Sequence, residues 1–198
     1  MGRRAAFLTL SLFVVAACGT PGVAPATVPD AAFTLTSPVM TQGGTLPVEF
    51  TCDGAAETPP LAWSGAPAGT LGYAVVMHTQ PQDGDAHWYW VLFDMAPTVD
   101  HLDLNATPPA KVGTNSVNGR IGYTPPCSKG PGAKVYTFTV YALSGRPDLP
   151  DPSAVSRPVL LVALNGLILA EAHLEVTYTR PAASGGAPPP AQTGVALP

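Results

Sequence analysis

Charged residues are scarce in this sequence. Lysine and arginine together number nine against thirteen aspartates and glutamates, so only 11% of the 198 residues are charged and the formal net charge is −4. No segment gathers the basic side chains together. Proteins that bind nucleic acids neutralise phosphates with clustered lysine and arginine. The composition therefore argues against a nucleic-acid partner.

The sequence also lacks a hydrophobic run long enough to span a bilayer. The longest run covers residues 5–17, whereas a spanning helix needs about 20 apolar residues. Arg3 and Arg4 precede this run, which ends in Ala16 and Ala17 directly before Cys18. A basic start, an apolar stretch and small residues at its end are typical of a secretory signal peptide. The cysteine directly after the small residues resembles the bacterial lipobox, whose cysteine receives a lipid and becomes the first residue of the mature chain.

These features predict a lipoprotein of the bacterial cell envelope, anchored to the membrane at Cys18 and facing the periplasm or the exterior. Residues 1–17 would be the signal peptide, and residues 18–31 a flexible, lipidated tether rich in Pro, Ala, Thr and Gly. One folded domain is expected over residues 32–181, followed by a disordered Pro/Ala/Gly-rich tail at residues 182–198. The alternative is a plain signal peptide followed by a chance cysteine.

Cysteine is rare as well, with three in the whole chain. If Cys18 carries the lipid, Cys52 and Cys127 remain, and an even pair in an exported protein indicates a disulfide. The bridge would close a loop of about 75 residues and stabilise the fold by on the order of 4 kcal/mol. The alternative of two buried free thiols stays open, because spacing alone does not bring two α-carbons within bridging distance.

The sequence contains none of the common motifs of hydrolytic catalysis. It has no Gly-x-Ser-x-Gly elbow, no His-Glu-x-x-His and no Ser-x-x-Lys. A thiol nucleophile is not expected either, because one cysteine would carry lipid and the other two would pair. We therefore expect a protein that is not an enzyme and that needs no cofactor.

The hydrophobic pattern that is present is mainly that of β-strands. Residues 135–143 and 172–178 alternate between apolar and polar positions. Residues 72–78 and 88–95 are nearly continuous apolar runs, which indicates strands buried on both faces. Shorter candidate strands are residues 33–36, 46–51 and 61–64.

One helix is predicted over residues 157–165. Ser156 is a suitable N-cap, Pro158 is tolerated in the first turn, and Gly166 can adopt the left-handed conformation that ends a helix. Many short strands separated by Pro and Gly clusters favour a mainly β fold, an antiparallel β-sandwich with one or two short helices.

A series of short motifs carries a family resemblance. They are FTLTSP at residues 33–38, TCDG at 51–54, PPLAWS at 59–64, GTN at 113–115, GRIGY at 119–123, PPC at 125–127, YTFTVYAL at 136–143 and LAEA at 169–172. In this order and spacing they resemble the phosphatidylethanolamine-binding protein family, in its bacterial Raf-kinase-inhibitor-like branch. The resemblance implies an antiparallel β-sandwich with a small pocket near one end that binds anionic groups such as phosphate.

The sequence departs from this family in the expected pocket. An Asp-Pro-Asp-x-Pro stretch usual in the family corresponds to HTQPQ at residues 78–82, so its acidic residues are missing. Tyr89 stands where the family has a pocket histidine, and Lys134 replaces a second histidine. Lysine supplies a positive charge and tyrosine hydroxyls donate hydrogen bonds, so an anion remains a reasonable ligand.

The predicted ligand is therefore a small anion, phosphate-bearing or carboxylated, with a phospholipid headgroup as one example. The predicted ligand-binding residues are His78, Thr79, His87, Tyr89, Tyr123, Pro125, Pro126, Lys134 and Tyr136. The alternative is that the histidines are ordinary strand-end or loop residues and that the tyrosines are structural.

The sequence also bears on a metal site and on a protein partner. His78, Asp83, Asp85 and His87 are of the right types for a zinc or copper site, but their spacing matches no ligand motif, so no metal is expected. The alternative function is a protein-interaction module such as a protease inhibitor, for which residues 97–109 would be the exposed loop. Kinase inhibition, known among eukaryotic relatives, fits an exported protein poorly.

Overall fold

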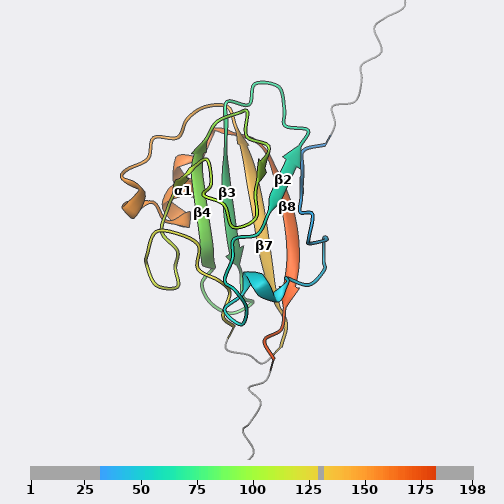
Figure 1. The fold of residues 1–198 in the computed structure, drawn as a ribbon. Coiled ribbons are helices and arrows are strands. Elements are labelled where there is room, and N and C mark those ends of the chain that lie inside the picture. Colours follow the sequence, from blue (N-terminus) through green and yellow to red (C-terminus); the bar gives the residue numbers. More distant parts are fainter. Residues whose placement is uncertain (1–31, 129–131, 182–198) are drawn as a thin grey trace, which may run out of the picture.

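The computed structural model describes residues 32–128 and 132–181, and Figure 1 shows two β-sheets packed face to face with a short helix on the outer side of the larger sheet. The signal peptide, the lipidated Cys18, the tether and the tail lie outside the described residues, so those assignments stay predictions. Among the described residues, no helix is both long and apolar enough to cross a membrane.

The larger sheet has five antiparallel strands in the order β6-β4-β3-β7-β8. They are β3 (Gly72–Thr79), β4 (His87–Met95), β6 (Lys111–Val112), β7 (Lys134–Leu143) and β8 (Ile168–Tyr178). The strands predicted at residues 72–78, 88–95, 135–143 and 172–178 are confirmed, and β8 begins four residues earlier than expected. The apolar runs of β3 and β4 are buried on both faces, because one face meets the smaller sheet and the other meets the helix.

The smaller sheet has three strands in the order β1-β2-β5. They are β1 (Thr34–Thr36), β2 (Leu61–Ser64) and β5 (His101–Leu102). The predicted strand at residues 46–51 is wrong, because a 3₁₀-helix, Val48–Phe50, occupies this segment. Pro47 fixes a φ of −58° at its start, and the Phe50 N–H donates to the Pro47 carbonyl at 3.1 Å, so the chain turns instead of extending.

The main core lies between the two sheets. Tyr136, Phe138, Val140 and Ala142 of β7 all face it, as their alternation predicts. The opposite face of the larger sheet packs against α1 (Arg157–Ala163), which covers a second apolar cluster.

Two local signals for α1 are confirmed. The Ser156 hydroxyl accepts a hydrogen bond from the Val159 N–H at 3.4 Å, and Gly166 has a φ of 78° just beyond the helix. The helix ends two residues before the predicted boundary at residue 165. A 3₁₀-turn, Pro152–Ala154, precedes it.

Candidate functional site

Four strand ends of the larger sheet meet at one end of the sandwich. Thr79 ends β3 opposite His87, which begins β4, and Lys134 begins β7 opposite Tyr178. Strand alternation places Thr79, His87 and Lys134 on the face that looks toward the smaller sheet, since Met77 and Tyr136 two positions along are part of the core between the sheets. The predicted ligand-binding tyrosines lie next to these strand ends.

A β-bulge brings Tyr89 into this cluster. Met77 pairs with Trp90 and His78 pairs with Trp88, so Tyr89 is an extra residue in β4 without its own partner in β3. Tyr89 and Trp90 therefore both face the core between the sheets, although neighbours in a regular strand point to opposite faces.

The tyrosine cluster, which we define as Tyr89, Tyr123 and Tyr136, is held by ring contacts. The rings of Tyr89 and Tyr136 meet edge to face at 5.4 Å, and Tyr123 meets Trp90 in the same way at 5.6 Å. The Tyr123 hydroxyl donates to the Phe50 carbonyl at 2.5 Å. Burial is the main cause that raises the pKa of each of the three tyrosines above its ordinary value. All three hydroxyls are therefore neutral hydrogen-bond donors at physiological pH.

The Tyr136 hydroxyl is not satisfied by the part of the chain that the structure describes. Its side chain is fully buried, and within residues 32–128 and 132–181 the hydroxyl forms no hydrogen bond of normal geometry. The Tyr89 hydroxyl approaches it closely enough for a weak hydrogen bond that contributes to the pKa of both tyrosines, but the contact does not have the geometry of a full hydrogen bond. An unsatisfied buried donor destabilises a protein by about 1–3 kcal/mol, and an acceptor supplied by a ligand would remove this penalty.

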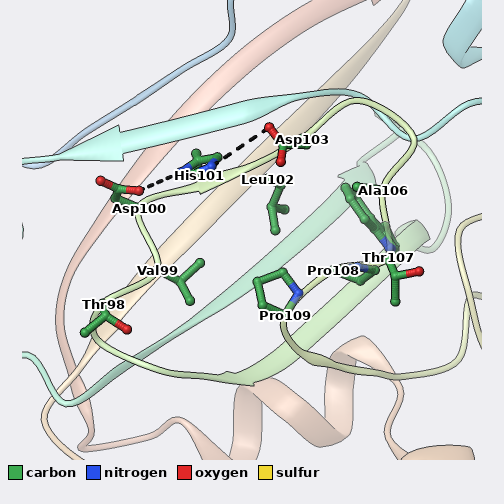
Figure 2. Close-up of a pocket in the computed structure, with 11 residues that line it drawn as sticks. Thr98, Val99, Asp100, His101, Leu102, Asp103, Ala106, Thr107, Pro108 and Pro109 are labelled. Atoms are coloured by element: carbon green, nitrogen blue, oxygen red, sulfur yellow. Dashed lines mark hydrogen bonds and ion pairs between the residues drawn. The ribbon is translucent and has the colours of Figure 1, made fainter.

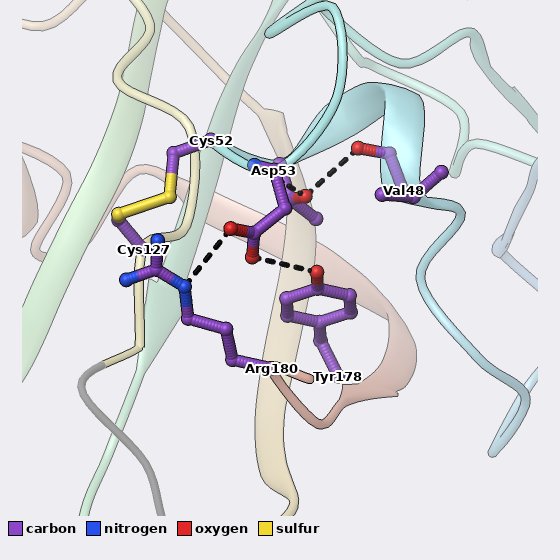
Figure 3. Close-up of a disulfide and its surroundings, with 7 residues drawn as sticks. Val48, Cys52, Asp53, Cys127, Tyr178 and Arg180 are labelled. Carbon is purple, nitrogen blue, oxygen red and sulfur yellow. Dashed lines mark hydrogen bonds and ion pairs between the residues drawn. A yellow bond between two sulfur atoms is a disulfide. The ribbon is translucent and has the colours of Figure 1, made fainter. Parts of the chain in front are cut away.

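The disulfide predicted between Cys52 and Cys127 is present, with 5.2 Å between the α-carbons (Figure 3). It joins the segment after the first 3₁₀-helix to the segment that follows Tyr123. Backbone bonds reinforce this connection, since the Cys52 N–H donates to the Pro126 carbonyl at 3.0 Å and the Thr124 N–H donates to the Tyr89 carbonyl at 2.9 Å. The bridge thus holds the proline segment beside the tyrosine cluster.

Asp53 forms a polar contact at the same edge that the sequence did not indicate. Its carboxylate accepts a hydrogen bond from the Tyr178 hydroxyl at 2.8 Å and another from the Arg180 Nε at 2.9 Å (Figure 3). The partners are separated by more than a hundred residues, and no local motif connects them. This contact ties the end of β8 to the disulfide-bonded segment.

The structure brings together most of the predicted ligand-binding residues. Tyr89, Tyr136 and Pro126 are buried, Tyr123 and Pro125 are partly buried, and His87 and Lys134 are exposed at the rim. Thr79 is buried, and its hydroxyl already donates to the Val135 carbonyl at 2.6 Å.

His78 is not brought together with these residues. It pairs with Thr137 and Trp88 and lies on the opposite face of the sheet, toward α1, because it is next to Thr79 in β3 and the pairing of β3 with β7 is regular here. Burial lowers the pKa of His78 to about 4, with smaller contributions from the charges of Arg157 and His173. The imidazole is therefore neutral at physiological pH. Among residues 32–128 and 132–181, no group of three or more His, Cys, Asp or Glu side chains could hold a metal ion.

The segment at residues 97–109 lines a separate cavity of about 210 Å³ beside β5. Figure 2 shows Val99, Leu102 and Pro109 around it, with Asp100, His101 and Asp103 along the strand. His101 lies 2.6 Å from the Asp100 carboxylate, and this hydrogen bond raises the pKa of His101. The Trp63 indole N–H donates to the Val99 carbonyl at 3.1 Å, so the segment is fastened to β2.

Comparison with known protein sequences identifies relatives over nearly the whole folded domain. The sequence profile of the phosphatidylethanolamine-binding protein family matches residues 36–179. A UPF0098 protein of Chlamydia muridarum is 35% identical over 150 residues, which cover 73% of this chain and 97% of that protein. A Mycobacterium tuberculosis protein named as lipoprotein LppC is 35% identical over 128 residues, which cover 64% of this chain and 62% of that protein.

Solved structures show the same fold. A phosphatidylethanolamine-binding protein homologue of Chlamydia trachomatis has a TM-score of 0.69 at 29% identity and matches 76% of this chain and 99% of its own. Escherichia coli YbcL, described as a new member of the mammalian family, has a TM-score of 0.68 at 27% identity and matches 75% of this chain and 99% of its own. The chain belongs to the phosphatidylethanolamine-binding protein family.

Proposed function

We propose that this protein is a binding protein, not an enzyme, and that it holds a small anion at the tyrosine cluster. The observation that carries the proposal is the fully buried Tyr136 hydroxyl, which has no hydrogen-bond partner of normal geometry among the described residues. An anion oxygen would accept this hydrogen bond in a water-poor environment, where such a bond is strong.

Lys134 would supply the charge. It precedes Tyr136 by two positions on the same face of β7, and its side chain is exposed at the rim of the site. A lysine ammonium and a neutral tyrosine hydroxyl together suit a phosphate or carboxylate oxygen. A phospholipid headgroup and a free phosphorylated molecule share this chemistry.

The ligand proposal is tested by calorimetric titration of phosphate and phosphoethanolamine into the wild type, Lys134→Met and Tyr136→Phe. Each substitution should weaken binding by about tenfold or more, since each removes one hydrogen bond to a charged group. Tyr136→Phe should leave the thermal stability unchanged or raised, because it removes an unsatisfied hydroxyl. Arg146→Gln, at the opposite end of the strands, is the matched control. Wild-type protein that binds neither anion, or Lys134→Met protein that binds as well as wild type, would contradict the proposal.

We also propose that the protein is a lipoprotein held in the bacterial cell envelope by a lipid on Cys18. The apolar run that ends in Ala16-Ala17-Cys18 supports this, as does the similarity to a protein named lipoprotein LppC. Membrane fractionation should find the wild type in the membrane pellet and Cys18→Ser in the soluble fraction. Mass spectrometry of the mature N-terminal peptide that showed an unmodified Cys18 would rule the anchor out.

A further inference from the structure

Asp94 of β4 has an unusual backbone and a mostly buried carboxylate. Its φ is 64°, in the left-handed region that residues other than glycine rarely adopt, and its side chain is 11% exposed. The pairing of β4 with β3 is irregular here, because Tyr73 pairs with Met95 and Val75 with Leu92. A carboxylate placed at a bulge is aimed differently from the side chains of a regular strand.

Two cations converge on this carboxylate. The Lys111 ammonium lies 3.0 Å from Oδ2, and the Arg146 Nε contacts Oδ1. Within residues 32–128 and 132–181, neither cation has another ion pair or hydrogen bond, so the Arg146 terminal nitrogens and two Lys111 donors remain available. Two positive charges share one negative charge, in a protein with only nine basic residues overall.

Two cavities flank the Arg146–Asp94 pair. The first, of about 210 Å³, is lined by both cations and by Asp148, with apolar walls from Phe93, Pro147 and Leu149. The second, of about 280 Å³, shares Asp94, Arg146 and Pro147 with the first. Its other lining residues are mostly apolar and include Leu71, Gly72, Met95, Pro97, Leu143 and Gly145.

This region is remote from the tyrosine cluster. Gly72, Met95 and Leu143 line the second cavity at one end of β3, β4 and β7, whereas Thr79, His87 and Lys134 lie at the other end of the same strands. Seven steps along β3 at ~3.3 Å each separate the two ends by roughly 23 Å. A ligand bound at one end does not reach the other.

We propose that the two cavities form a binding site for a small organic anion with an apolar body. The anionic group would lie against Lys111 and Arg146, and the apolar body would lie along Leu71, Pro97 and Leu143. Leu71 is 63% exposed, and burial of such a side chain favours an apolar ligand. Asp94 already orders both cationic side chains, which reduces the ordering that binding requires.

The negative charge of Asp148 limits the charge that a bound ligand can carry. Its carboxylate also lines the first cavity and repels anions. The lining side chains Asp94, Lys111, Arg146 and Asp148 carry two charges of each sign, which leaves no net charge to hold a dianion. A carboxylate with one charge meets less repulsion from Asp94 and Asp148 than a phosphate dianion does, and is therefore favoured over phosphate.

The proposal is tested by titrating hexanoate into the ¹⁵N-labelled protein and following backbone amide shifts. Saturable shifts are expected at Leu71, Gly145 and Arg146, and they should persist in Lys134→Met protein, in which the tyrosine cluster has lost its positive charge. Acetate, which lacks the apolar body, and hexanol, which lacks the charge, should each bind at least tenfold more weakly than hexanoate. Hexanoate that produces no saturable shifts, or that binds no better than hexanol, would overturn the proposal.

Variants separate this site from the tyrosine cluster. Arg146→Gln and Lys111→Met should each weaken the hexanoate binding reported by Leu71 and Gly145 about tenfold, whereas Lys134→Met should leave the shifts of these two residues unchanged. All three side chains are exposed, so the fold should persist, and circular dichroism checks this. Leu71→Ser should weaken hexanoate and leave acetate unaffected. Hexanoate binding that depends on Lys134 instead of Arg146 would overturn this site, whereas loss of phosphate binding alone would count only against the tyrosine cluster.

Discussion

Replacing both Cys52 and Cys127 by serine is expected to lower the free energy of unfolding by about 4 kcal/mol. The disulfide closes a loop of 75 residues, and its loss returns conformational freedom to the unfolded chain. For a domain of this size, the melting temperature should fall by roughly 10 °C or more. Thermal unfolding followed by circular dichroism measures both effects.

The same variant should also lose order at the tyrosine cluster. The bridge holds Pro126 against Cys52, and the Tyr123 hydroxyl is bonded to the Phe50 carbonyl two residues before that cysteine. The control is reductant, which should destabilise the wild type and leave the double-serine variant unchanged. A variant as stable as oxidised wild type would show that the bridge contributes nothing to stability.

Gly113→Ala is expected to destabilise the protein by about 3 kcal/mol. A Cβ atom at this position would lie 2.2 Å from the Val155 carbonyl oxygen and 3.0 Å from Val91 Cγ1. The backbone would have to move, and the bond from the Gly113 N–H to the Val91 carbonyl, 2.8 Å long, would weaken. The Gly122 N–H donates to the Gly113 carbonyl at 3.2 Å. A displacement of the Gly113 backbone would therefore also displace Gly122 and, next to it, Tyr123 of the tyrosine cluster.

Urea unfolding of Gly113→Ala and Gly145→Ala tests this explanation. An added Cβ at Gly145 would meet only Leu167 Cδ2, at an ordinary 3.6 Å, so this control should stay within about 1 kcal/mol of wild type. Equal stabilities for the two variants would show that the close approach of Gly113 to Val155 is unimportant.

The long strands could be predicted because their patterns are local. Residues 135–143 alternate along a strand that is apolar on the face toward the smaller sheet, and β3 and β4 are apolar throughout because they are covered on both sides. Residues 46–51 have a similar apolar content, but Pro47 imposes a turn that the pattern does not reveal. The strands β5 and β6 have two residues each, too few to show any period.

The candidate site could be predicted only in part. The tyrosines and Lys134 were identified from the family resemblance, and the structure places them at one edge. The family resemblance also implies His78 for the pocket, but His78 is adjacent to Thr79 in β3, and adjacent residues in a strand point to opposite faces. The bulge that turns Tyr89 inward depends on the register with β3, which no property of β4 alone determines.

Local patterns along the chain were sufficient to predict the four long strands and the N-cap at Ser156, and the order of the short motifs indicated the family. Pairing between distant segments decided which polar side chains contact each other. The Asp53 contact with Arg180 spans 127 residues, and the Asp94 contacts with Lys111 and Arg146 join β4 to β6 and to the loop after β7. Such contacts form only when the sheets have assembled, because the strand register and the bulges set which side chains face each other.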